Sequence, residues 1–325
     1  MKLTNLKDSP EFVEKTIKLI EQEFEYDEVN SFAIDFYPLM QKSNHHNNFI
    51  YIAEDEVIAH IGVLEKEFIL NGITYPFSMY GGIAVSKKHQ GQGIFKSLFN
   101  EVINKFTNKC FHLLWSEKVD LYKKFGFFPC LELNEYKKES FQHSFDVIQT
   151  TLSNLSEDDY MMVKSLYISS KELRVSRSES DWKNLKPIDS TDLFLIKNNS
   201  KIINYFFMNK GQDLTHIIHE YGFMNDEQLQ LLRHYANVWT PYLSDTNKTN
   251  LYATMLRPGE KSLFTSFIQN YLAIEILDIN ENITFKYQEN SYEQSINDFL
   301  IGAFGPGRFK EITSPYLFIS GLDSI

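Results

Sequence analysis

The stretch at residues 80–99 contains the residue types and spacing that could do chemistry. Ile83 and Val85 are β-branched and two residues apart, which is typical of a strand, and apolar residues recur at helical spacing further on. Gly91 and Gly93 lie between the two patterns. A glycine loop that joins a strand to a helix points several unpaired backbone N–H groups, and the positive end of the helix dipole, at one place. Such a loop can bind a phosphate or a diphosphate.

Positive charge surrounds this loop, although the chain as a whole is acidic. Five lysines and one acid, Glu101, lie between residues 80 and 110, whereas the formal net charge of the chain is −11. A local positive region on an acidic protein suits an anionic ligand. The alternative is that the glycines form only a turn. Two common phosphate loops are excluded, because no Gly-x4-Gly-Lys-Ser/Thr sequence is present and Lys96 stands where a dinucleotide-binding loop has its third glycine.

The loop resembles the signature of the GNAT superfamily of acyl-CoA-dependent N-acyltransferases, which is Gln/Arg-x-x-Gly-x-Gly/Ala. Here the signature reads Gln90-Gly91-Gln92-Gly93-Ile94-Phe95, with a phenylalanine in the last position. Downstream, Leu121-Tyr122-Lys123-Lys124-Phe125-Gly126-Phe127 looks like the Tyr-x-x-x-Gly-Phe segment of the same family, and it follows an apolar strand at residues 111–115. Two motifs in this order are more specific than either alone. The resemblance covers roughly residues 10 to 140.

The resemblance implies a site for acetyl-CoA as cosubstrate. In relatives the pantetheine arm pairs with the end of the fourth strand, and the diphosphate receives backbone N–H groups of the loop. Lys87, Lys88 or Lys96 would reach the ribose phosphate, and the alternative is that these lysines are only solvated. The implied cofactor-binding residues are Ile83, Ala84, Val85, Lys88, Gln90, Gly91, Gln92, Gly93, Ile94 and Phe95.

The resemblance also implies direct attack of an amine on the thioester carbonyl. The N–H of Val85 would stabilise the carbonyl oxygen as charge builds, and Tyr122 would protonate the leaving thiolate. The alternative for Tyr122 is a core tyrosine. Glu117 is a candidate for the base that removes the proton of the amine, and its alternative is a carboxylate favoured at a helix start. Further candidates for the base are His60, His112, Glu65 and, as in two-domain relatives whose C-terminus reaches the active site, the terminal carboxylate of Ile325.

Apolar periodicity predicts the element order of a GNAT domain in the first half of the chain. The expected helices cover residues 9–24, 29–41, 93–107 and 118–125. The expected strands cover residues 49–53, 57–64, 65–70, 74–85, 111–116 and 127–133. Asn71-Gly72 predicts a tight hairpin turn between two of these strands.

The second half repeats part of this order. Strands are expected at residues 192–196, 201–208 and 214–221, a helix at 226–236, and a strand at 251–256 that corresponds to residues 111–116. The glycine loop is missing, because the only glycine between residues 222 and 226 is Gly222, and Asn225 or Asp226 suits a helix N-cap. One cofactor site is therefore expected. The apolar tail, residues 312–325, is expected to pack against the body.

The predicted fold class is α+β, with two GNAT-like domains, each a mixed, mostly antiparallel sheet flanked by helices. The predicted domains are residues 1–148, with the acyl-CoA site, and residues 149–325, degenerate and followed by the tail. A length of 325 residues and a hydrophobic content of 43% are consistent with two folded cores.

Composition narrows the class of protein. The start of the chain has no apolar signal region and no run is long enough for a membrane span, so a cytoplasmic protein without a membrane partner is expected. Cys110 and Cys130 are expected to be free, and neither they nor the pair His45-His46 has partners at a metal-ligand spacing, so no metal is expected. The acidic charge argues against nucleic acid as a partner.

The leading hypothesis is an N-acetyltransferase that moves the acetyl group of acetyl-CoA to a primary amine, on a small molecule or a peptide, in a ternary complex. The alternative from another class is a non-catalytic acyl-CoA-binding regulator or scaffold. A tandem-GNAT ligase that uses aminoacyl-tRNA is a third possibility, which the intact loop and the acidic charge disfavour.

Overall fold

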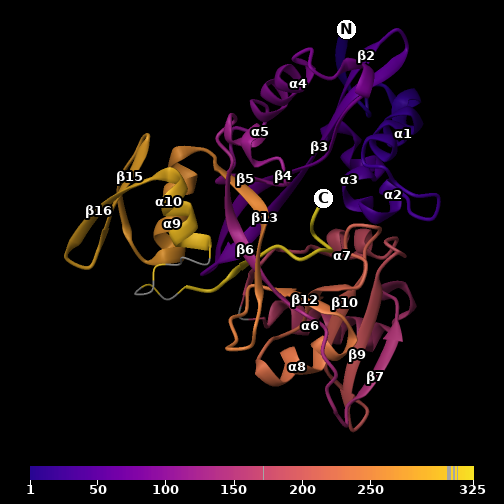
Figure 1. Ribbon diagram of the computed structural model, residues 1–325, viewed down its shortest axis with the longest axis vertical. Coiled ribbons are helices and arrows are strands. Elements are labelled where there is room, and N and C mark those ends of the chain that lie inside the picture. Colours follow the sequence, from indigo (N-terminus) through magenta and orange to yellow (C-terminus); the bar gives the residue numbers. More distant parts are fainter. Residues whose placement is uncertain (171, 306–308, 310–311, 313) are drawn as a thin grey trace.

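The computed structural model describes residues 1–170, 172–305, 309, 312 and 314–325, and one large sheet runs through both halves of the chain (Figure 1). The first half supplies β1 (Lys2–Asn5), β2 (Asn48–Ala53), β3 (Glu56–Leu70), β4 (Ile73–Val85), β5 (Phe111–Trp115) and β6 (Phe128–Tyr136). The second half supplies β7 (Asp146–Thr150), β9 (Asp192–Asn198), β10 (Lys201–Met208), β11 (Ile217–Tyr221), β12 (Asn237–Thr240) and β13 (Thr249–Pro258). These 12 strands are ordered β1-β2-β3-β4-β5-β13-β6-β12-β11-β10-β9-β7.

The two halves exchange a strand at the centre of this sheet. β13 lies between β5 and β6, with Leu114 opposite Met255, and β6 lies between β13 and β12, with Tyr136 opposite Val238. β4–β5 and β11–β12 are the parallel pairs, and the other pairs are antiparallel. The predicted α+β class with mixed, mostly antiparallel pairing is confirmed. The fusion of two sheets into one was not predicted.

The predicted domain boundary after residue 148 falls inside β7, which pairs along its whole length with β9. Because β6 and β13 each belong to both halves of the sheet, the division into residues 1–148 and 149–325 stays a prediction about folding units.

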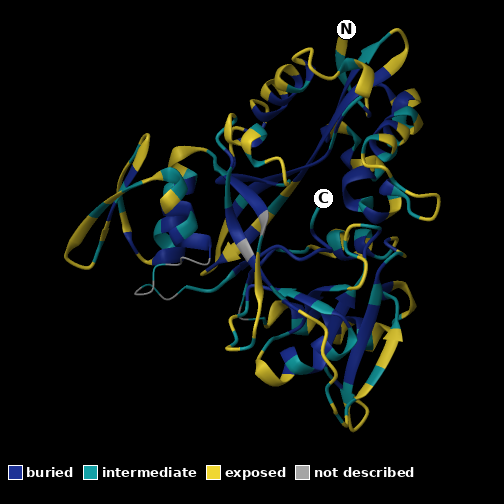
Figure 2. Cartoon of the chain, viewed as in Figure 1, coloured by how far each residue is buried: buried dark blue, intermediate teal, exposed yellow. Residues whose placement is uncertain are grey.

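Helices cover both faces of the first half. α4 (Ile94–Ile103) and α5 (Val119–Lys123) lie on one face, and α1 (Val13–Glu23), α2 (Phe32–Asp35) and α3 (Tyr37–Met40) lie on the other (Figure 1). The strands between them are mostly buried and the outer faces of the helices are exposed (Figure 2). Leu98, Phe99 and Val102 of α4 are completely buried, as the apolar spacing predicts.

One predicted helix and two predicted strands differ from the structure in detail, and one predicted turn is confirmed. The expected helix at 29–41 is two single turns, α2 and α3, because Pro38 opens α3 and cannot continue a preceding helix. The expected strands at 57–64 and 65–70 form one strand, β3. The turn at Asn71-Gly72 is confirmed, since φ is +51° at Asn71 and +77° at Gly72.

The second half contains α6 (Glu157–Ile168), β8 (Leu173–Arg174), α7 (Glu179–Leu185) and α8 (Asp226–Tyr235). The short strand β12 was not predicted. It is β12, and not β13, that corresponds to β5, because β12 pairs in parallel with β11 as β5 does with β4. β12 has four residues, of which only Val238 and the half-buried Trp239 are apolar, and this pattern is too short to be found by periodicity.

The last part of the chain forms a side layer and then returns to the centre. α9 (Lys261–Leu272), β14 (Glu275–Ile279), β15 (Asn282–Tyr287), β16 (Asn290–Ser295) and α10 (Ile296–Phe304) make the layer. β17 (Leu317–Phe318) then pairs in parallel with β8, and the tail residues Ile319 and Leu322 are buried. The predicted packing of the tail is confirmed for its described residues. None of the described helices combines the length and the apolar character needed to cross a bilayer.

Candidate active site

β4 and β5 diverge at the centre of the first half. Their parallel pairing runs from Phe77 opposite Phe111 to Tyr80 opposite Leu114, and β4 then continues to Val85 paired only with β3. Ser86 N donates to Ile58 O on β3. Because alternate residues of a strand turn their N–H groups to opposite sides, the N–H of Val85 faces the side from which β5 has diverged. An extended chain could therefore pair with this edge of β4.

A bulge at Gly82 shapes this edge. The register of β4 against β3 shifts here, and Gly82 has φ of +57°. Nδ1 of His60 lies 2.7 Å from Gly82 O, and Nε2 lies 3.0 Å from Oδ1 of Asn48. Burial lowers the pKa of His60 to about 4. His60 is therefore a neutral side chain that holds the backbone of the bulge.

The glycine loop is open. Gly91 and Gly93 have φ of +76° and +78°, and a Cβ built on either would meet no atom within 4 Å. The backbone N–H groups of residues 91–96 have no acceptor among the described residues. Open space beside free N–H groups at the start of α4 is the arrangement that binds a diphosphate.

The glutamine side chains of the signature hold the loop from behind. Nε2 of Gln90 donates to Val85 O at 2.9 Å and to Oε2 of Glu23 at 3.0 Å, and Nε2 of Gln92 donates to Lys88 O at 3.1 Å. Both amides already bind groups of the protein, so they can affect a ligand only by fixing the shape of the loop. The side chain of Lys88 is exposed beside it.

Tyr122 lies in α5, beneath the loop. It is buried, and its ring meets the ring of Phe95 edge-on at 5.7 Å. Phe95, which replaces the small residue of the signature, also packs against Phe125. Burial raises the pKa of Tyr122 to about 12, while a hydrogen bond with Ser116 opposes the shift. The phenol is therefore protonated at neutral pH, as a proton donor must be.

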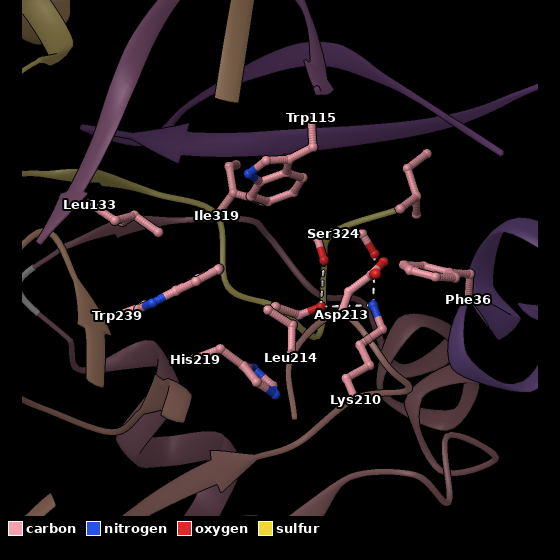
Figure 3. Close-up of a pocket in the computed structure, with 12 residues that line it drawn as sticks. Phe36, Trp115, Leu133, Lys210, Asp213, Leu214, His219, Trp239, Ile319 and Ser324 are labelled. Carbon is pink, nitrogen blue, oxygen red and sulfur yellow. Dashed lines mark hydrogen bonds between the residues drawn. The ribbon is translucent and has the colours of Figure 1, made fainter. Parts of the chain in front are cut away.

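A cavity of about 210 Å³ lies between the two halves (Figure 3). Its walls are mostly apolar and come from β5, β6, the strands of the second half and the tail. The lining residues are Phe36, Trp115, Leu133, Lys210, Asp213, Leu214, His219, Trp239, Ile319, Gly321, Ser324 and Ile325.

The tail joins this cavity to β4. A Cβ built on Gly81 would lie 2.6 Å from the main-chain carbon of Ile325 and 2.9 Å from its side chain. Only glycine leaves room for this contact. Ile325 thus contacts β4 and also lines the cavity.

Buried charges of the second half hold the tail in place. Nζ of Lys210 donates to Gly321 O at 2.7 Å and to Ser324 O at 2.8 Å (Figure 3). Arg177 binds Asp323 of the tail, with Nε 3.0 Å from Oδ1, and it also binds Glu220. The side chains of Arg177, Glu220 and Asp323 are almost fully buried, so removal of one partner would leave an unpaired charge.

The candidates for the base are spread over different environments. Glu117 is exposed just after β5 and does not line the cavity. Glu65 forms an ion pair with Lys109. His112 is buried with Nδ1 2.7 Å from Oγ of Ser78, and burial, helped by the charges of Arg257 and Lys109, lowers its pKa to about 3. The structure brings Ile325, of these candidates, to the cavity.

Sequence reasoning missed the residues of the second half that line the cavity, chiefly Lys210, Asp213 and Trp239. Lys210 and Asp213 follow the end of β10, where a short polar stretch after a buried strand reads as an ordinary loop. Its only sequence signal is a lysine and an acid placed directly after an apolar strand. Among the described residues, no cluster of three or more His, Cys, Asp or Glu side chains could hold a metal ion.

Comparisons with known proteins agree with this geometry. Residues 8–130 match the family model of an acetyltransferase (GNAT) domain. This part of the chain is therefore similar to GNAT acetyltransferase domains. No curated protein matches the sequence.

Solved structures extend the likeness to the whole chain. A GCN5-related N-acetyltransferase from Anabaena variabilis has a TM-score of 0.61 at 14% identity, over 92% of this chain and 89% of that chain. Eis1 from Mycobacterium abscessus has a TM-score of 0.60 at 11% identity, over 93% and 89%. N-myristoyltransferase from Saccharomyces cerevisiae, solved with bound myristoyl-CoA, has a TM-score of 0.51 at 11% identity, over 79% and 82%. At such identities the likeness shows the fold, which covers both halves.

Proposed function

We propose that the protein is an N-acetyltransferase that moves the acetyl group of acetyl-CoA directly to a primary amine. The observation that carries the proposal is the open glycine loop, with free N–H groups at residues 91–96, beside an unpaired edge of β4. The bound myristoyl-CoA of the similar yeast structure supports a CoA thioester as the donor.

The proposed donor site follows the two free backbone surfaces. The pantetheine arm pairs with residues 83–85, the N–H groups of residues 91–95 bind the diphosphate, and Lys88 is placed to meet the ribose phosphate. Gly91 and Gly93 fit this role because nothing fills the space above them. The thioester then lies near Gly81 and Gly82, where the bulge turns the strand toward the cavity.

In the proposed reaction the amine nitrogen attacks the thioester carbonyl, a C–N bond forms and the C–S bond breaks. A backbone N–H of the free edge of β4 beside the thioester stabilises the oxyanion, and Tyr122 gives its proton to the leaving sulfur. Two carboxyl groups are proposed as the acceptor of the amine proton. Glu117, exposed, would act through water, and the carboxyl group of Ile325 would act within the cavity. Free, buried Cys110 and Cys130 support a cytoplasmic location.

Titration calorimetry with acetyl-CoA and a thiol-release assay with a panel of primary amines test the proposal. We expect binding in the micromolar range and amine-dependent release of CoA at a rate of roughly 1–1,000 per second at saturation. Absence of binding to acetyl-CoA and CoA would refute the proposal. Binding without thiol release for any amine would instead favour a non-catalytic acyl-CoA-binding protein.

A further inference from the structure

The cavity between the two halves is built mainly from large apolar side chains. Trp115 and Trp239 stand on different strands and both line it, with Leu133 and Ile319 between them in Figure 3. Phe36 closes the side toward the N-terminal helices. Flat indole and phenyl rings bury much apolar surface at little cost in conformational entropy, so these walls favour a ligand that has an apolar, preferably flat, body.

The polar groups of the cavity are few, and most are already used. Nζ of Lys210 donates its two hydrogen bonds among the described residues to carbonyl oxygens of the tail. Nε2 of His219 lies 2.9 Å from Asn209 O, whereas its Nδ1 is buried without a partner among the described residues, and burial lowers the pKa of His219 to about 4, so this ring is neutral. Asp213 is then the acidic side chain that remains among the lining residues.

The carboxyl group of Asp213 can pair with one cation. This group is partly buried, which raises its pKa, while the charge of Lys210 lowers it. Phe36 lies beside it in the cavity, with its ring centroid 4.4 Å from Nζ of Lys210, and burial lowers the pKa of Lys210 to about 7. A cationic ligand at this corner would meet an aromatic face beside a lysine that is only partly charged at neutral pH. The described lining holds one further carboxyl group, that of the C-terminal Ile325, which the proposed function assigns to the proton of the reacting amine.

The position of β4 gives the ligand its direction. The reactive nitrogen must reach the thioester, which the proposed function places near Gly81, where Ile325 meets the strand. The rest of the ligand must extend away from β4, toward Trp239 and Leu133. The cavity of about 210 Å³ is too small for a folded peptide and large enough for one ring with a short chain.

We propose that the acceptor is a small arylalkylamine, with one primary amine and one aromatic ring. This inference rests on the proposed function and names the substrate class of its acceptor site. Phenethylamine represents the proposed class, and spermidine and a lysine-containing tripeptide represent the polycationic and peptide alternatives.

The test compares kcat/KM for these three amines at saturating acetyl-CoA. We expect phenethylamine to exceed spermidine and the tripeptide by at least about 30-fold, because their extra polar groups lose hydration without gaining partners. Binding is measured independently by quenching of tryptophan fluorescence. Trp115 and Trp239 line the cavity and should report phenethylamine, whereas Trp182 is buried elsewhere.

A matched pair of variants locates the effect. Trp239→Leu removes an aromatic wall, and we expect KM for phenethylamine to rise about tenfold with kcat and acetyl-CoA affinity nearly unchanged. Tyr235→Leu removes a half-buried ring that packs against Phe194 and Phe206 outside the cavity, and it should leave KM unchanged. Leu214→Trp, which fills the cavity, should abolish phenethylamine binding while acetyl-CoA still binds.

The outcomes separate this inference from the proposed function. Acetylation of spermidine or the tripeptide at least as efficient as that of phenethylamine would overturn the inference and keep the acetyltransferase. Quenching by phenethylamine, lost in Leu214→Trp, without acetylation of any amine would refute acetyl transfer and keep an arylalkylamine site. Equal KM values for Trp239→Leu and the wild type would also overturn the inference.

Discussion

The two halves of the molecule use the same position, between a strand and the N-terminus of a helix, in opposite ways. Before α4 the N-cap is Gly93, whose missing side chain leaves the first N–H groups of the helix free. Before α8 the N-cap is Asn225, whose side chain accepts a hydrogen bond from Gln228 N at 2.8 Å. A helix end that satisfies its own donors cannot offer them to a phosphate.

The halves also differ in where they bury charge. In the first half, the buried side chain of His60 binds the backbone of β4. The second half buries Arg177, Glu220 and Lys210 against the tail and so brings Ile325 to Gly81. The second half thus lacks the free N–H groups of the first half and uses its buried charges to hold the tail that lines the shared cavity.

The largest effect is expected from the same substitution at the two N-caps. Gly93→Asp puts a negative charge and a side chain into the free cradle, and we expect the affinity for acetyl-CoA, measured by calorimetry, to fall at least about 100-fold. Asn225→Asp adds the same charge where Asp is also a good N-cap, and affinity should stay unchanged. Equal losses in both variants would mean that net charge, and not the loop, governs binding.

Tyr122→Phe sharpens the contrast within the first half, between the residues that bind the donor and the one that reacts. Phenylalanine keeps the ring contacts with Phe95 and Phe99 and removes only the hydroxyl group, which carries the proton. We expect kcat to fall about 100-fold while the Kd for CoA changes less than about twofold. Because the pKa of Tyr122 is about 12, this group should cause no loss of the wild-type rate between pH 7 and 10. A wild-type kcat in the variant would exclude Tyr122 as the acid.

Gly81→Ala tests the link between the halves. The new Cβ would lie 2.6 Å from the main chain of Ile325, so the tail must move away from β4. We expect kcat/KM for the amine to fall about tenfold with unchanged affinity for CoA, since the loop is not touched. Steady-state kinetics and calorimetry measure the two quantities.

A double-mutant cycle shows whether the tail carries this effect. In a chain that ends at residue 323, Gly81→Ala should cost nothing further, because the residue it displaces is gone. An additive loss in the shortened chain would mean that the alanine disturbs β4 itself.

Sequence alone predicted the first half well because its signals are local. Gly91 and Gly93 interrupt a strand-to-helix pattern, and Asn71-Gly72 requires positive φ, so each position fixes a backbone shape through neighbours in the chain. The roles of Ile83, Val85 and Tyr122 came from family resemblance and stay proposals, while the structure places them around one loop.

The cavity could not be predicted because no local pattern specifies it. Trp115 and Trp239 are more than a hundred residues apart in the chain. They line the same cavity only because β13 of the second half lies between β5 and β6, and β6 of the first half lies between β13 and β12. The sequence of a strand does not show whether the strand pairs with one from its own half or with one from the other half. The anchoring of the tail by Arg177 and Lys210 depends on the same long-range packing.

The smallest effect is expected from Asn225→Ala, and it defines what the second N-cap does. If Asn225 only satisfies the donors of α8, its loss should lower the free energy of unfolding by about 1 kcal/mol and leave affinity for acetyl-CoA unchanged. Urea unfolding followed by circular dichroism measures the first quantity, with Asn225→Asp as the variant that keeps the cap. A change in CoA affinity larger than about threefold would show that the second half communicates with the loop, and the proposed division of tasks between the halves would then be wrong.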